Sequence, residues 1–532
     1  MRKRSTGLPE LPPPPTRGPE GTALSALLRA RRFRLGAGAE RVAHNLRAFG
    51  GEVAADAAPW IGAVRPPADA PSVSLGEHAG TLGPRSFGFF NNVGGVAAFD
   101  APLTGPLRRG GLALVVPRRD ALPDLGPLAL ARGLGISWII SVGDGDPAEA
   151  IAFLGADPLT DSLAVVLGAG ASGASLRPVL GAKPTVVWGG DAVCQAVARR
   201  AGSLVVDGID EWLARAALLD AGVEPGARVS IVVVGGGRSY VEREVALARL
   251  DADVTVVDER EPAELAGAVA QAAGAGRPVV LVAGGPPVAA PLPAGPDEDG
   301  AKPRMLWADL RHPEHLRALL HALAAAAVEP ESESRKGSRI DKELLERVRA
   351  EVDRELSDHD AKRLLKAYGA RVTRQAPSNT PTGAMKIAKT IGLPVALVAG
   401  AEERVAETLP DVRRLAALLL QQMAEAEVPL PSVIVREFFS EVPRVRAKVA
   451  GEKGLGLTLR VGDSVALLPL TRADATQLAA ATPARRASDQ KAVAELLLRI
   501  AACAAGEDAL LDLELHVGAE PAVLSASATL RR

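Results

Sequence analysis

Short apolar runs alternate with amphipathic segments through much of the chain. The stretch Thr185–Val206 predicts a buried strand, a tight turn at Gly189 and Gly190, an amphipathic helix and a second short strand. The same alternation recurs between residues 111 and 210. It is typical of a parallel sheet with right-handed crossover connections.

A second strand–turn–helix–strand unit follows in residues 228–257, and its turn consists of three glycines. Gly235, Gly236 and Gly237 separate a Val-rich strand from a helix. Three glycines before a helix can direct backbone N–H groups at an anion, and they also serve plain strand-to-helix turns. The three glycines are therefore candidate cofactor-binding residues, with an ordinary turn as the alternative.

The segments outside these units carry weaker patterns. Residues 1–20 contain the run Pro12–Pro15 and predict a disordered tail. Residues 21–82 show a helical pattern with short turns. Gly36–Ala39 has no apolar strand before it there, so we expect a helix-start turn and not a dinucleotide fingerprint. The charged stretch 330–339 predicts a flexible linker.

Composition narrows the class of protein. A chain of 532 residues is too long for one core and predicts several domains. The formal net charge of -1 argues against broad electrostatic binding to nucleic acid or anionic membranes. No apolar run is long enough to span a bilayer. Two cysteines cannot build a disulfide framework, which favours a reducing, cytoplasmic setting.

Several motifs are similar to those of one known family. The stretches that carry the similarity are LGPRSFG (82–88), GLALVVPRRDAL (111–122), ARGLGISWIISVGDGD (131–146), DPLTDSLAVVLGAG (157–170), LSDHDAKRLLKAYGARVTRQ (356–375), KIAKTIGLPVAL (386–397) and SVIVREF (432–438). They resemble the NDP-forming acyl-CoA synthetases, the ADP-forming acetate–CoA ligases related to succinyl-CoA synthetase. The resemblance spans residues 82–532.

The resemblance implies an α/β multidomain fold. It assigns a truncated CoA-binding-like lobe to residues 21–82 and two flavodoxin-like parallel-sheet domains to 83–220 and 221–329. A C-terminal ATP-grasp-like α+β domain would occupy 340–532. The family also implies CoA, ATP or ADP and magnesium as ligands, and assembly into homo- or hetero-oligomers.

The family's functional residues are replaced at several positions. Two glycines alone precede Asp191, so the loop that carries the family's phosphorylated histidine is missing. Gly168 replaces the glutamate that orients this histidine, and Val398 stands in place of a phosphate-binding lysine. His516 and Ser525 stand in place of magnesium ligands. Phosphoryl transfer depends on positioning and charge neutralisation, so these replacements predict an inactive protein with no catalytic residues.

Residues that remain at the corresponding turns are candidates for binding. Arg118 and Arg119 can hold an anion through their side chains, with solvent-exposed loop arginines as the alternative. Gly143 and Asp144 persist in a βα turn, where capping of the next helix is the alternative role. Glu437 survives on the strand that resembles the family's hinge.

The sequence His-Pro-Glu-His at 312–315 suggests a pair of metal ligands. Pro313 at the first position of a helix explains the pattern better, and the sequence offers no third ligand. We therefore predict no metal site.

Three functions remain under consideration. The preferred one is a catalytically inactive acyl-CoA synthetase-like protein with a structural or regulatory role, paired with an active paralogue. The alternative is an active ADP-forming acyl–CoA ligase that uses another phosphorylated residue or a partner's histidine loop. The third is a CoA- or nucleotide-binding module without catalysis.

Overall fold

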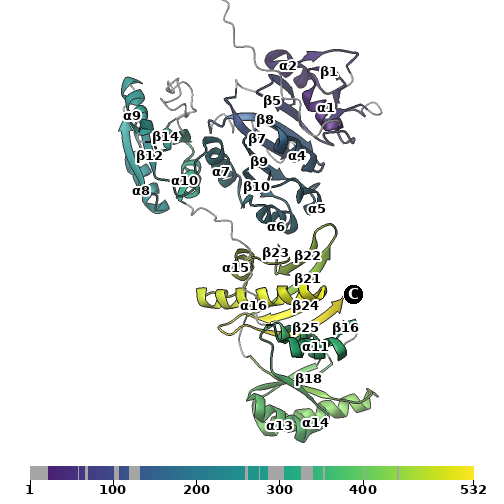
Figure 1. The fold of residues 1–532 in the computed structure, drawn as a ribbon. Coiled ribbons are helices and arrows are strands. Elements are labelled where there is room, and N and C mark those ends of the chain that lie inside the picture. Colours follow the sequence, from purple (N-terminus) through teal and green to yellow (C-terminus); the bar gives the residue numbers. More distant parts are fainter. Residues whose placement is uncertain are drawn as a thin grey trace, which may run out of the picture. The chain divides into compact units, whose positions relative to one another are not determined.

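The computed structural model of this chain forms two compact units, Met1–Pro330 and Glu331–Arg532, which are described separately below. Figure 1 colours their helices and strands along the sequence. The predicted tail, the linker at 330–339 and Arg119 lie outside the described residues. The described residues are 22–57, 59–65, 70–100, 107–118, 132–257, 262–274, 276–284, 305–324, 340–351, 354–400, 402–439 and 443–531.

The first unit begins with a four-stranded parallel sheet in the order β2-β1-β3-β4. The expectation of a strandless segment is wrong, because β1 directly precedes Gly36. This strand escapes the hydrophobic pattern because Phe33 is its one fully buried residue, between Arg32 and Arg34. The elements are α1 (Ala23–Arg29), β1 (Arg32–Leu35), α2 (Glu40–Phe49), β2 (Glu52–Val53), β3 (Trp60–Gly62) and β4 (Ser72–Ser74).

The central sheet has seven strands in the order β11-β10-β9-β7-β8-β5-β6. Strands β7 to β11 run parallel to one another. The β5–β6 hairpin lies at one edge of the sheet, where β5 pairs with β8 in the antiparallel direction. Within the parallel part, β8-β7-β9-β10-β11 is the flavodoxin strand order that we expected. The elements are β5 (Gly88–Asn91), β6 (Val96–Phe99), β7 (Arg109–Pro117), β8 (Ile136–Gly143), α4 (Ala148–Ala156), β9 (Ser162–Leu167), α5 (Gly173–Leu176), β10 (Thr185–Gly189), α6 (Ala192–Arg200), β11 (Leu204–Val206) and α7 (Ile209–Ala221).

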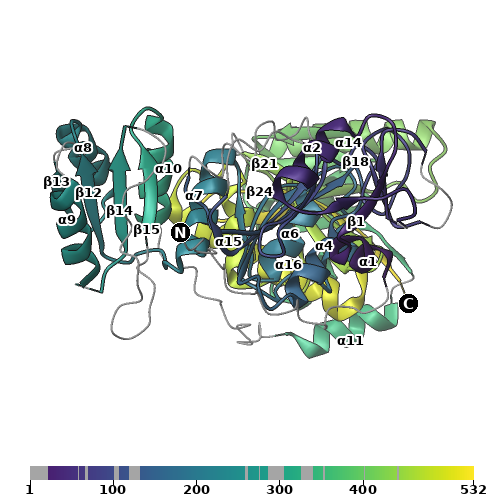
Figure 2. The same ribbon diagram turned by 90° about the horizontal axis from the view of Figure 1, so that it is seen from above.

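The strand–turn–helix–strand segment predicted at residues 228–257 belongs to a parallel sheet in the first unit. Its strands have the order β13-β12-β14-β15 and lie side by side in Figure 2. Helices α8 and α10 contribute to one hydrophobic cluster with β12 and β14, and α9 contributes to another. The first cluster also contains α7, so the two parallel sheets share a core. The elements are β12 (Val229–Val234), α8 (Arg238–Ala248), β13 (Ala252–Val257), α9 (Pro262–Gly274), β14 (Val279–Ala283), β15 (Met305–Asp309) and α10 (Pro313–Ala324).

The second unit, Glu331–Arg532, contains two antiparallel sheets. A four-stranded sheet in the order β17-β20-β18-β19 shares a core with α13 and α14. A six-stranded sheet in the order β16-β25-β24-β21-β22-β23 shares a core with α12 and α16. The elements are α11 (Lys342–Glu351), β16 (Glu355–Leu356), α12 (Asp358–Ala367), β17 (Gln375–Ser378), α13 (Pro381–Ile391), β18 (Val395–Ala399), β19 (Glu402–Ala406), α14 (Leu409–Glu425), β20 (Val433–Glu437), β21 (Arg444–Glu452), β22 (Gly456–Val461), β23 (Ser464–Leu467), α15 (Arg472–Ala480), α16 (Ala487–Glu507), β24 (Ala509–His516) and β25 (Ala522–Leu530).

Together these sheets establish a multidomain α/β fold with several parallel sheets. Among the described residues, no helix has the length and apolar character that crossing a membrane requires.

Candidate functional site

The predicted Gly143–Asp144 turn at the end of β8 is closed by another loop of the same unit. Arg85 pairs with Asp144, and its Nε donates to Oδ2 at 2.7 Å. Gly143 has a φ of 65°, and a Cβ there would point at the carbonyl oxygen of Pro84. Asp144 does not cap α4, but Oδ1 of Asp146 in the same turn accepts a hydrogen bond from the backbone N–H of Ala148, the first residue of this helix, at 3.0 Å. The turn is therefore occupied by protein groups.

The other predicted residues of the first unit lie in separate places. Arg118 directly follows β7 and is half-buried. Gly237 is the N-cap residue of α8 with a φ of 118°, and no side chain caps this helix. A Cβ at Gly236 would meet nothing within 4 Å. A side chain would thus have room at Gly236, whereas a Cβ at Gly237 would lie 3.0 Å from Cδ1 of Leu310.

The turn after β1 is filled by an aromatic side chain. Cβ atoms at Gly36 and Gly62 would lie 2.5 and 2.6 Å from Cζ2 of Trp60. Trp60 itself is buried. Its indole therefore occupies the crevice between β1 and β3, where the strand order reverses and where open α/β sheets commonly bind ligands.

In the second unit, Glu437 ends β20 and pairs with Arg374. Arg374 donates from Nη2 to Oε1 at 3.0 Å and from its backbone N–H to Oε2 at 3.2 Å. Burial would raise the pKa of Glu437, but the hydrogen bonds from Arg374 outweigh it and the pKa is lowered. Glu437 is therefore an ionised partner that orients Arg374.

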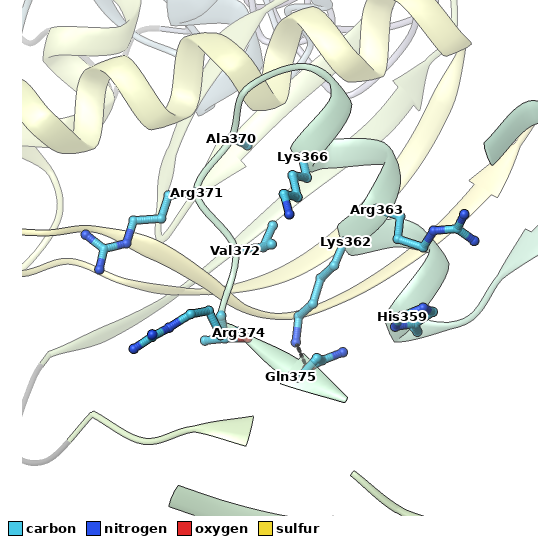
Figure 3. Close-up of a pocket in the computed structure, with 10 residues that line it drawn as sticks. His359, Lys362, Arg363, Lys366, Ala370, Arg371, Val372, Arg374 and Gln375 are labelled. Atoms are coloured by element: carbon cyan, nitrogen blue, oxygen red, sulfur yellow. Dashed lines mark hydrogen bonds between the residues drawn. The ribbon is translucent and has the colours of Figure 1, made fainter. Parts of the chain in front are cut away.

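Arg374 belongs to a cavity of about 420 Å³ that sequence analysis did not find (Figure 3). No acidic side chain is among its lining residues within the described chain. Six of the ten lining residues are basic or histidine, which makes the cavity a candidate anion site. The lining residues are His359, Lys362, Arg363, Lys366, Ala370, Arg371, Val372, Thr373, Arg374 and Gln375.

Helix periodicity explains why α12 contributes four of these residues. Ser357 caps the helix, accepting a hydrogen bond from the backbone N–H of Asp360 at 3.3 Å. Ala361, Leu364 and Leu365 face the core, which leaves a polar stripe at i, i+3, i+4 and i+7. That stripe consists of His359, Lys362, Arg363 and Lys366. This spacing is the sequence signal that could have revealed the cavity.

Lys362 is the most buried cation of the cavity, with its side chain only 3% exposed. Its Nζ donates to Oε1 of Gln375 at 2.7 Å and lies 2.9 Å from Oδ2 of Asp358. Burial lowers the pKa of Lys362, although the neighbouring Asp358 opposes the shift. Figure 3 shows Lys362 and Lys366 extending from α12 toward the segment that carries Val372.

The arginines of the cavity have carboxylate partners outside its lining. Arg363 pairs with Glu351 at 2.7 Å, and Arg371 pairs with Glu520 at 2.5 Å. These pairs are partly exposed, so each contributes little and can rearrange toward an incoming anion. Lys366 has no ion-pair partner among the described residues.

One residue of the lining, Thr373, carries a buried hydroxyl. Thr373 is 2% exposed, and its Oγ1 has no hydrogen-bond partner within the described chain. Because this oxygen is itself inaccessible, a ligand in the cavity could reach it only after a local movement. The cations and the amide of the lining suit a ligand with several anionic oxygens.

The positions that depart from the family motifs are built into the scaffold. Val398 of β18 pairs with Ile434 of β20. His516 is buried at the end of β24, with its ring 4.4 Å from that of Phe439. Ser525 pairs with Glu514 across β24 and β25. Within the described residues these positions do not form an oxygen-rich metal centre.

Comparison with known proteins gives distant structural likenesses. No family model and no curated protein matches the chain. A dinucleotide-forming acetyl-coenzyme A synthetase 1 from Ca. Korarchaeum cryptofilum, in complex with coenzyme A, is 20% identical with a TM-score of 0.32, over 36% of this chain and 100% of the other. The same protein in complex with phosphate and ADP is 16% identical with a TM-score of 0.40, over 56% and 96%.

A protein from Pyrococcus horikoshii OT3 is 15% identical with a TM-score of 0.40, over 57% of this chain and 98% of the other. All of these likenesses combine low identity with low TM-scores. They carry no functional argument, so the function is argued from the residues of this chain.

Proposed function

We propose that this chain is a catalytically inactive acyl-CoA synthetase-like protein with a regulatory role, controlled by a phosphate-bearing anion. The cavity of the second unit is the observation that carries the proposal. Its lining provides basic, amide and hydroxyl groups but no carboxylate, cysteine or metal-ligand constellation. A lining in which cations predominate and no carboxylate is present supports the binding of an anion.

The first unit supports the absence of phosphoryl transfer. The chain contains no histidine between His78 and His312, and the whole seven-stranded sheet lies in that interval. The Gly143–Asp144 turn is occupied by Arg85. A histidine relay at this sheet would need a histidine from outside residues 88–206.

ATP, ADP and CoA share the required chemistry, because each carries a diphosphate with several anionic oxygens. Such a ligand would lie between α12 and the segment 370–375. Cations on two elements would then contact one anion and tie α12 to β17. A ligand-dependent link of this kind gives a regulator a way to change its surface for an active partner.

Calorimetric titration of the full chain with ATP and, separately, with CoA tests the binding claim. We expect saturable heat for at least one ligand, and no heat for either would overturn it. A turnover assay with acetate, CoA and ATP–Mg²⁺ tests inactivity. Sustained ATP consumption by the wild-type chain would replace this proposal with an active ligase.

The regulatory claim needs a third measurement. The chain is mixed with a related active synthetase, and the synthetase's turnover is followed with and without the ligand. Neither co-purification nor any change in turnover would leave a binding module without a regulatory role.

A further inference from the structure

Three side chains at the start of α10 bring possible metal-ligand atoms together. Nδ1 of His312 lies 3.4 Å from Oε1 of Glu314, and Nε2 of His315 lies 3.8 Å from the same oxygen. All three atoms lie within 4.8 Å of one another. The motif alone predicts no metal site, because Pro313 at the start of a helix explains it and no third ligand is apparent. In the folded chain Glu314 lies close to both histidines and can supply that ligand.

A fourth group comes from α7, a different helix. Oδ1 of Asp210 lies 3.4 Å from Nε2 of His315. Nη2 of the buried Arg132 donates to the same oxygen at 3.1 Å and holds this carboxylate in position. Helices α7 and α10 contribute to one hydrophobic cluster and lie next to each other in Figure 1. Two histidines and one carboxylate therefore lie close together at the start of α10, and a second carboxylate, that of Asp210, lies beside His315.

The separations between these atoms are those of a coordination shell. At 3.4–3.8 Å the nitrogen–oxygen pairs are too long for good hydrogen bonds. Two ligands that each lie about 2.0–2.1 Å from a tetrahedral zinc ion are about 3.3 Å apart. The His312, Glu314 and His315 atoms need only small shifts to reach that spacing, and Asp210, which lies near His315, would move further to become a fourth ligand.

Burial and charge suit a divalent ion of the zinc type. His315 is 9% exposed, which favours the neutral imidazole that binds metals. Its Nδ1 is buried with no partner among the described residues, so its polar contacts lie on the Nε2 side. The positive end of the α10 dipole and the charge of Arg132 disfavour the binding of a cation here. The negative charges of Glu314 and Asp210 offset that repulsion.

We propose that His312, Glu314, His315 and Asp210 bind one divalent transition-metal ion, with zinc as the best match, and that the ion ties α10 to α7. Mixed imidazole and carboxylate ligands favour zinc over magnesium or calcium, which prefer oxygen alone. The site is structural, because it joins two helices of the shared core.

The test uses the full chain without an added histidine tag, freed of metal by chelator and titrated with ZnCl₂ in a calorimeter. We expect one zinc ion per chain. His312→Ala should weaken binding at least tenfold, because one of four ligands is lost. His312 is exposed, so this variant should fold. The control is His321→Ala, which removes another exposed histidine of the same helix.

Cobalt(II) provides a second readout, since four-coordinate cobalt absorbs visible light far more strongly than the hexaaqua ion. The wild type and His321→Ala should give this absorption, and His312→Ala and Glu314→Gln should lose it. Zinc should also raise the melting temperature of the wild type but not of His312→Ala. Millimolar-only zinc binding, or equal affinity of His312→Ala and wild type, would overturn the proposal.

Discussion

Lys366 provides the sharpest test of the cationic cavity. It extends toward the segment 370–375 and has no ion-pair partner among the described residues (Figure 3). Replacing it leaves no carboxylate without its counter-charge. Replacing Lys362 would instead leave the carboxylate of Asp358 without its ion-pair partner. A loss of ligand binding in that variant could therefore reflect damage to the fold.

The expected effect of Lys366→Ala follows from the worth of one charged contact. A hydrogen bond to a charged group contributes about 1.5–3 kcal/mol, and an exposed ammonium belongs at the lower end. A loss of about 1.5 kcal/mol corresponds to about tenfold in Kd. Lys366→Glu adds repulsion to the lost attraction, so we expect about a hundredfold weakening. Both effects should shrink at high salt.

The assay is calorimetric titration of each variant with whichever of ATP or CoA binds the wild type. The control is Lys453→Ala, which removes an exposed lysine from the turn between β21 and β22. Its affinity should equal that of the wild type. If both Lys366 variants bind like the wild type, the ligand does not occupy this cavity. If Lys453→Ala weakens binding equally, the attraction is a general charge effect.

Three further predictions concern stability and pH. Arg349→Met should lower the unfolding free energy of the chain by about 3 kcal/mol in a urea titration, because Glu507 is buried and accepts a hydrogen bond from Arg349 at 2.7 Å; an unchanged midpoint would contradict this. Gly143→Ala should cost at least about 1–2 kcal/mol in the same assay, since its φ of 65° disfavours a side chain; a neutral result would mean that the loop relaxes freely. Burial lowers the pKa of His516 below 6.5 despite the nearby Glu437, so the unfolded chain binds more protons as the pH falls through 6.5. Stability should therefore decrease on acidification, and His516→Gln should show a flatter pH dependence of its melting temperature.

Local sequence predicted the elements whose residues are consistently apolar. The strand–turn–helix–strand pattern of Thr185–Val206 is confirmed, and both turn glycines, Gly189 and Gly190, have positive φ angles. Such segments are buried on both faces of a parallel sheet, so hydrophobicity alone identifies them. Strand β1 was not predicted in this way, because arginines flank its one fully buried side chain.

The candidate sites depended on tertiary contacts. No local pattern could pair Arg85 with Asp144 or place Asp210 of α7 beside His315 of α10, because their distances along the chain are large. The basic stripe on α12 can be read from the sequence, but the sequence does not indicate that the stripe lines a cavity. Only the folded chain brings Arg374 opposite that stripe and leaves the cations around a common cavity.

The sequence by itself thus determined the α/β class and two of the three parallel sheets of the first unit. Hydrophobic periodicity and single-residue identity carry this information locally. The tertiary structure decided which charged groups meet and which turns are closed. These depend on pairs of residues far apart in sequence, and their energies exist only once the chain has folded.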